Sequence, residues 1–352
     1  MVTIPPFPLL ALGAVSLVIG VLTGEARMGW EVPAADLMLH GPLMVSGFFG
    51  TVIGLERAVA LGRKWGYLAP LLTGAGGVAL AAGLPATPLL VFGSLVFLAM
   101  ALVVVRRQPE VFTAVMALGA VAWVAGNAAW FHGATIPRVV PLWACFLVLT
   151  IAGERLELSR FLPPRRHRVP TLLAPLTLVL AGAAFASPLA FGLGLVLLFA
   201  WSLANDVVRR TIRQGGLTRY VAVCLLSGYG WLALSGLLMP FAEGWLYDAA
   251  LHALFVGFVF AMVFGHAPVI LPAVVKIKIA YGRHFYAPLA LLHGGLIVRV
   301  AGDLLAMDEL RRCGGLLNGI ALAAFIATMV AAALRAKAGA KGKPGAAPSP
   351  AA

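Results

Sequence analysis

Long apolar runs separated by short polar connections fill almost the whole chain. A helix needs about 20 mainly apolar residues to cross the hydrocarbon layer of a membrane, and most of the runs have that length. They are continuous, whereas the strands of a membrane β-barrel alternate apolar and polar positions. The pattern predicts an all-α, polytopic integral membrane protein with about twelve transmembrane helices. The predicted helices lie at residues 7–24, 37–55, 66–83, 86–105, 111–131, 139–153, 169–186, 188–205, 219–240, 249–275, 285–306 and 314–334.

The composition agrees with this pattern. Apolar residues make up 61% of the 352 residues and charged residues 11%, which leaves little for a separate soluble domain. We expect one transmembrane helical domain, residues 1–334, and a disordered basic cytoplasmic tail, residues 335–352. The first run lacks a preceding basic segment and is followed by eleven more, so it is predicted to be a helix rather than a cleaved signal peptide.

Several functional classes are excluded by motifs that the sequence lacks. Cys145, Cys224 and Cys313 stand singly, which excludes a disulfide framework, a zinc knuckle and covalently attached c-type haem. The short motifs of nucleotide-binding proteins, zinc proteases and serine hydrolases are also missing. Any function must therefore reside in the polar side chains of the helices.

Basic residues gather in alternate connections between the predicted helices. If the N-terminus is cytoplasmic, 21 of the 26 Lys and Arg residues lie on the cytoplasmic side, as the positive-inside rule requires. This predicts that both termini face the cytoplasm and that the chain spans a bacterial inner (plasma) membrane many times. Topology thus explains the net charge of +13, so the expected partner is the lipid bilayer and not nucleic acid.

Four histidines lie within predicted helices, where ionisable side chains are costly and mark functional sites. Counted from the nearest cytoplasmic basic residue, His40 and His252 lie in the outer half of the membrane. His266 and His293 are each ten residues from such a residue. They are predicted to share a deeper layer and to approach each other, as a second metal site or as a hydrogen-bonded pair. Hydrogen bonds between helices are the alternative explanation for His266 and His293.

Two methionines share a helix face with these histidines. Met44 lies one turn from His40, and Met262 lies one turn from His266. Imidazole suits haem iron and copper, and thioether sulfur suits Cu(I) or an axial position of haem. The four histidines and both methionines are therefore candidate metal ligands, although methionine is also a common filler of gaps in packing.

Arg299 is the single arginine or lysine predicted to lie within the membrane, away from the ends of the predicted helices. Its simplest partner is Asp303, one turn further out. A carboxylate of a cofactor, such as a haem propionate, is the functional alternative. Arg311 and Arg312, in the predicted outer connection between the last two helices, are the other cations placed to bind such a group. These three arginines join the two outer histidines as candidates for cofactor binding.

Three stretches resemble a known family. HGPLMVSGFFGTVIGLERAV (40–59), DAALHALFVGFVFAMVFGHAP (248–268) and HGGLIVRVAGDL (293–304) are similar to the NnrS family of twelve-helix bacterial membrane proteins. The layout is more distantly similar to subunit I of the haem–copper oxidases. The NnrS resemblance implies bound haem and copper and a role in nitric oxide stress during denitrification.

The oxidase resemblance implies roles for particular residues. His40 and His252 match the histidines that hold a low-spin haem on the second and tenth helices, and Arg311 and Arg312 match the arginines that bind its propionates. The stretch 264–272 is similar to a copper-binding histidine segment. The chain has no adjacent His-His pair, so a complete oxygen-reducing centre is not expected.

Three functions compete at this point. The leading hypothesis is a haem-binding and also copper-binding inner-membrane protein that takes part in the nitric oxide response or in respiratory redox chemistry, with a small gaseous or redox ligand and a respiratory-chain partner. The main alternative is a secondary transporter, a twelve-helix permease for a small solute or metal. An assembly factor for a respiratory complex is the third, and the sequence leaves open whether the protein catalyses a reaction.

The predicted topology can be tested with reporter fusions after residues 30, 163 and 245. We expect cytoplasmic reporter activity at 163 and periplasmic activity at 30 and 245, because the basic connections stay in the cytoplasm. An active periplasmic reporter at 163 would overturn the topology.

Overall fold

The computed structural model describes residues 5–341, and every regular element in that range is helical. The predicted all-α class is confirmed. Two π-helical segments, η2 (Leu43–Phe49) and η6 (Ala253–Phe260), interrupt otherwise α-helical rods. The α-helices are α1 (Pro6–Arg27), α2 (His40–Pro42), α3 (Gly50–Leu61), α4 (Leu68–Ala81), α5 (Thr87–Arg107), α6 (Val111–Phe131), α7 (Ile136–Leu158), α8 (Arg168–Ala184), α9 (Pro188–Asn205), α10 (Val208–Thr211), α11 (Gly216–Leu238), α12 (Gly244–His252), α13 (Ala261–Val275), α14 (Tyr286–Leu305) and α15 (Asp308–Lys341).

Ten helical rods in the described range are long and apolar enough to cross a membrane. Two of them are composite, because α2, η2 and α3 form one rod and α12, η6 and α13 form another. Two further apolar helices are shorter, α4 with 14 residues and α8 with 17. The chain is thus built as a multi-pass membrane protein, while the count of twelve crossings and the orientation stay predictions.

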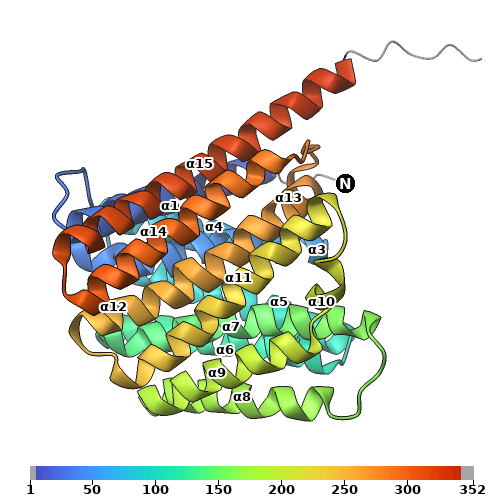
Figure 1. Cartoon of the computed structure of the whole chain (residues 1–352), viewed down its shortest axis with the longest axis horizontal. Helices are drawn as coiled ribbons and strands as arrows, with labels where there is room; N and C mark the ends of the chain where they lie inside the picture. The colour runs from blue at the N-terminus through green and yellow to red at the C-terminus, as the bar shows by residue number, and fades with distance from the viewer. Residues whose placement is uncertain (1–4, 342–352) are drawn as a thin grey trace, which may run out of the picture.

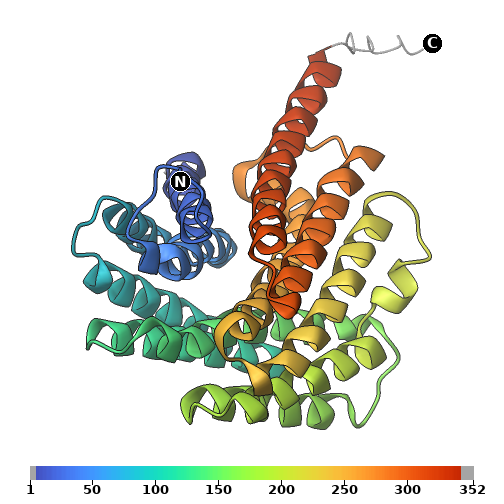
Figure 2. The same ribbon diagram turned by 60° about the vertical axis from the view of Figure 1, so that its left-hand side comes forward.

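The helices lie side by side in a bundle, and α14 packs along α15 (Figure 1). Figure 2 shows the N-terminal helices, in blue, apart from the C-terminal helices α14 and α15, in orange and red. Helices from the middle of the chain, in green, lie below both groups in this view. The two groups still touch, because α1 contacts α15 and α13.

The centre of the bundle is α7. Its residues from Cys145 to Leu149 are each at most 1% exposed, so this helix is buried on every face. The outer helix α5 differs, since Phe92 on it is 60% exposed and Leu102 is 47% exposed. Exposed apolar side chains of this kind suit contact with lipid and would be unfavourable in water.

A buried polar cluster joins the early helices to α7. The Asn127 side chain accepts hydrogen bonds from Ser46 Oγ (2.9 Å) and Trp143 Nε1 (3.0 Å), and it donates to the carbonyl oxygen of Leu90 (3.2 Å). Trp123 Nε1 donates to Ser46 Oγ at 3.1 Å. One amide therefore links four helical segments, η2, α5, α6 and α7, in a region without water to replace it.

Two boundaries differ from the sequence prediction. α15 begins at Asp308, so Arg311 and Arg312 lie in a helix and not in the expected connection. The same helix continues to Lys341, so residues 335–341 of the expected disordered tail are helical. The rest of that tail, 342–352, lies outside the described residues. Residues 308–341 have no proline or helix-ending glycine motif before 341, which explains why the helix continues.

Replacing Asn127 with leucine should destabilise the bundle. The Ser46 hydroxyl and Trp143 Nε1 would lose their acceptor. Each buried donor left unpaired should lower the free energy of unfolding by about 1–3 kcal/mol. Thermal unfolding of the detergent-solubilised protein measures the effect, and Thr177→Ala at an exposed helix position is the control. Equal melting of the two variants would contradict the structural role of this amide.

Candidate functional site

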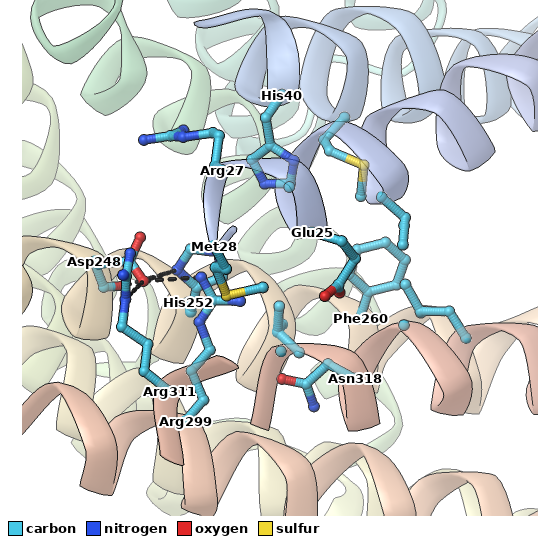
Figure 3. A pocket seen from close by; sticks show the side chains of 17 residues that line it. Glu25, Arg27, Met28, His40, Asp248, His252, Phe260, Arg299, Arg311 and Asn318 are labelled. Atoms are coloured by element: carbon cyan, nitrogen blue, oxygen red, sulfur yellow. Dashed lines mark hydrogen bonds and ion pairs between the residues drawn. The ribbon is translucent and has the colours of Figure 1, made fainter. Parts of the chain in front are cut away.

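The ends of five helical segments enclose a polar cavity at one end of the bundle (Figure 3). The C-terminal parts of α1, α12 and α14 and the beginnings of α2 and α15 supply its polar side chains. Its volume is about 60 Å³. Prominent among the lining residues are Glu25, Arg27, Met28, His40, Met44, Asp248, His252, Arg299, Arg311 and Asn318.

His40 and His252 come together in this cavity although 211 residues separate them in the chain. Their ring centroids are 6.2 Å apart and their planes are inclined by 21°. Figure 3 shows His40 pointing from the α2 side toward the side that carries His252. Gly24 of α1 allows the His40 ring to pack closely against that helix, because a Cβ atom at residue 24 would lie 2.8 Å from the ring.

The hydrogen bonds of these two rings leave one nitrogen of each available. His40 Nδ1 lies 2.7 Å from the carbonyl oxygen of Gly20, and His252 Nδ1 lies 2.8 Å from that of Asp248. A carbonyl oxygen only accepts, so in a neutral ring each Nδ1 carries the proton and each Nε2 keeps its lone pair. Neither Nε2 has a hydrogen-bond partner among residues 5–341. A hydrogen bond from the opposite ring nitrogen to a backbone carbonyl is also what orients histidine ligands of metals.

The other two candidate histidines are bonded differently. His266 Nδ1 lies 2.7 Å from the carbonyl oxygen of Met262, and its Nε2 accepts from the Arg155 guanidinium at 3.0 Å. His293 Nδ1 accepts from Trp231 Nε1 at 3.0 Å. A donor therefore occupies the ring lone pair in both. The expected hydrogen bond between His266 and His293 is wrong, because each bonds to another helix.

The two candidate methionines also differ. Met44 lines the cavity, with its sulfur against Gly20 of α1. Met262 does not line it, and instead packs against Gly228 of α11. Met28, which the sequence analysis did not select, supplies a second thioether to the cavity.

Asp248 is the centre of the charged groups around the cavity. Its Oδ2 lies 2.8 Å from Arg299 Nη2, 3.4 Å from His252 Nδ1 and 3.8 Å from Arg311 Nε. Arg311 Nε also lies 3.1 Å from Asp303 Oδ1. The expected Arg299–Asp303 pair is thus wrong, because Arg299 reaches across to α12 and Asp303 pairs with α15.

The arginines divide into two groups by position. Arg299 and Arg311 line the cavity but are already paired with carboxylates. Arg312 is not among the lining residues, since its guanidinium donates to the carbonyl oxygen of Gly29 and lies 4.9 Å above the Trp30 ring. Arg27 lines the cavity and has no ion pair among residues 5–341. It is the cation most available to an anionic group.

A π-helical segment follows each of the two cavity histidines. η2 begins three residues after His40, directly after Pro42, and η6 begins immediately after His252. π-Helical turns are rare and often occur at functional sites. The similar sequences LHGPLMVSGFFG and LHALFVGFVFAM thus fold into the same irregular local structure on two sides of the cavity.

The residues fit a metal held by two imidazoles. Metal–nitrogen bonds of about 2 Å and a ring radius of about 1 Å place the centroids of two opposed imidazoles roughly 6 Å apart, close to the observed 6.2 Å. The cavity itself has room for a metal ion or about two water molecules. A porphyrin ring needs far more space than about 60 Å³, so haem binding requires the lining helices and side chains to move apart.

Sequence reasoning missed Asp248, Glu25 and Arg27 as parts of this site. Asp248 had a usable signal, since it precedes His252 by four residues and therefore shares its helix face. Glu25 and Arg27 had none, because the end of a predicted helix says nothing about which other helix end lies beside it.

The fold and the site define a class, a multi-pass helical membrane protein with a histidine pair in a charged cavity. A model of the family described as a domain of unknown function, DUF8744, matches residues 7–334. The chain belongs to this family. A comparison with curated proteins finds no match.

Replacing Asp248 with asparagine should destabilise the fold and disturb His252. Arg299 and Arg311 would then lose the carboxylate that they share. Because their charges are partly buried, the free energy of unfolding should fall by roughly 2–4 kcal/mol. Asp308→Asn, at a residue whose side chain is 56% exposed, is the matched control. Thermal unfolding compares the two, and equal melting temperatures would show that the cluster adds no stability.

Proposed function

We propose that this protein binds haem in the membrane, with the iron ligated by His40 Nε2 and His252 Nε2. The observation that carries the proposal is the pair of free imidazole lone pairs, 6.2 Å apart between ring centroids, each fixed by a backbone carbonyl at Nδ1. Such preparation of two facing rings has no other use in the described contacts. The resemblance to the NnrS family and to the oxidase plan supports the same cofactor.

Other residues of the cavity would orient the histidines, bind the propionates and exclude water. Asp248 holds the His252 ring and balances the charge of Arg299, while Arg27 is available to a propionate at the end of the cavity. Apolar Phe260 and Val256 supply a dry wall. Haem contributes reversible one-electron redox chemistry when bound.

The arrangement favours respiratory redox chemistry over gas binding. Both His40 and His252 would be committed to holding the iron, so this pair would suit electron transfer better than the binding of a gas such as nitric oxide. A role in the nitric oxide response rests on the resemblance alone. Copper is the second metal that we propose for the same cavity, because its histidines together with Met28 and Met44 suit Cu(I).

We place the protein in the bacterial inner membrane with twelve crossings and both ends in the cytoplasm. The distribution of basic residues supports this orientation. The short helices α4 and α8 would then cross with the help of their flanking segments.

A permease for a small solute or metal ion is the second candidate. The small cavity favours it, because about 60 Å³ suits an ion without any rearrangement. Interrupted helices beside a charged cavity are also typical of carriers. η2 and η6 provide such interruptions here.

The absorption spectrum of the purified full-length protein, expressed with ample haem, tests the haem proposal. We expect a Soret band and low-spin α and β bands on reduction. His40→Ala and His252→Ala should each abolish or shift these bands, because each removes one axial ligand. His167→Ala and His284→Ala, at exposed positions, should leave them unchanged.

Two results would overturn the haem site. One is a wild-type protein without a Soret band, and the other is an unchanged spectrum in both cavity variants. Elemental analysis of the same sample then separates the alternatives. Copper that is lost in His40→Ala supports a metal-ion site, and absence of any metal supports the permease.

A further inference from the structure

A second cavity lies beside the first one, between α1 and α15. It has a volume of about 330 Å³ and forms an apolar groove lined by Leu17, Val21, Leu316, Ile320 and Ile326, among others. Ile320 is 47% exposed and Ile326 is 45% exposed, so the groove opens toward the lipid side. Most of its lining residues come from α1, blue in Figure 2, and from α15, red in Figure 2.

Two polar groups in this groove lack partners. Glu25 is 7% exposed, and its Oε2 is buried without a hydrogen bond from any residue in the described range. Trp30 Nε1 is likewise buried without an acceptor there. Both residues line the groove. An unpaired buried donor or acceptor costs about 1–3 kcal/mol, so one of each in the same groove calls for a ligand that satisfies both.

We infer that the groove binds a membrane-soluble quinol. A ring hydroxyl would donate to Glu25 Oε2, and an oxygen elsewhere on the ring would accept from Trp30 Nε1. The apolar tail would lie between α1 and α15, along Leu17 and Ile326. A volume of about 330 Å³ falls within the range of about 300–1,000 Å³ that small-molecule sites occupy.

The chemistry of the groove distinguishes this ligand from a phospholipid. Glu25 would repel the phosphate of a lipid headgroup, whereas it accepts a hydrogen bond from a neutral hydroxyl. The guanidinium that contacts Trp30, that of Arg312, already lies over the Trp30 ring and bonds to Gly29. A neutral head that carries both a donor and an acceptor fits these groups better than an anion.

The groove also adjoins the histidine cavity. Val21, Glu25, Gly319 and Leu322 line both, so these side chains form the wall between them. A ring bound at Glu25 would lie next to the proposed haem site. Binding in the groove does not depend on haem, and its test reads out without haem.

Photolabelling tests the groove. The full-length protein, in vesicles of phosphatidylcholine, is labelled with an azido-ubiquinol kept reduced by excess dithionite, and the labelled peptides are identified by mass spectrometry. We expect label on peptides from α1 and α15 and competition by decylubiquinol. Glu25→Gln should weaken that competition about tenfold, because a neutral amide is a weaker acceptor for the hydroxyl. Glu31→Gln, at an exposed position, is the matched control.

A second pair of variants guards against loss of folding. Ile320→Trp fills the groove from an exposed position and should abolish the labelling, whereas Val330→Trp, 54% exposed on the same helix, should not. Equal labelling of these two variants would overturn the proposal. So would competition by phosphatidylglycerol in place of decylubiquinol, which would make the groove a lipid site. Labelling without a Soret band would remove the haem proposal and leave this one standing.

Discussion

The absence of water inside a membrane is the constraint on which this structure depends. Each polar side chain in an apolar helix has to find its partner on another helix, because the lipid offers none. The partners found here are specific. Asp248 on α12 pairs with Arg299 on α14, and Asn127 on α6 accepts from Ser46 and Trp143. These bonds fix which helix ends lie together and so create the polar cavity.

The same constraint gives meaning to groups that remain unpaired. At the deeper level, Arg155 bonds to His266, and the Arg57–Glu154 ion pair joins α3 to α7. Tyr229 bonds to Asp206 between α11 and the end of α9. These groups bond to each other between helices and so stabilise the packing of the bundle. The Nε2 atoms of the two cavity histidines are different, because lone pairs set free by a bond at the opposite ring nitrogen are ready for a ligand.

The two cavities offer different chemistry within a short distance. The charged cavity presents paired imidazoles, thioethers and a carboxylate with two arginines. The neighbouring groove is apolar, apart from one carboxylate and one indole N–H. The proposed haem site would therefore lie beside the groove proposed for a membrane-soluble quinol, and that neighbourhood would suit electron exchange between them. In a permease, the charged cavity would instead lie between two halves of the protein that move against each other.

The sequence by itself determined the fold class and the rods of the bundle, because an apolar run of about 20 residues has only the helix as a structure in lipid. It also selected His40 and His252, since ionisable groups in such runs are rare. It could not determine pairing. Asp303 was the nearest carboxylate to Arg299 along the helix, yet the tertiary structure brought Asp248 closer. Likewise, only the packed helices decided that His266 and His293 lose their lone pairs to Arg155 and Trp231. Contacts between helices depend on the rotation and depth of each rod, which a hydropathy pattern leaves open.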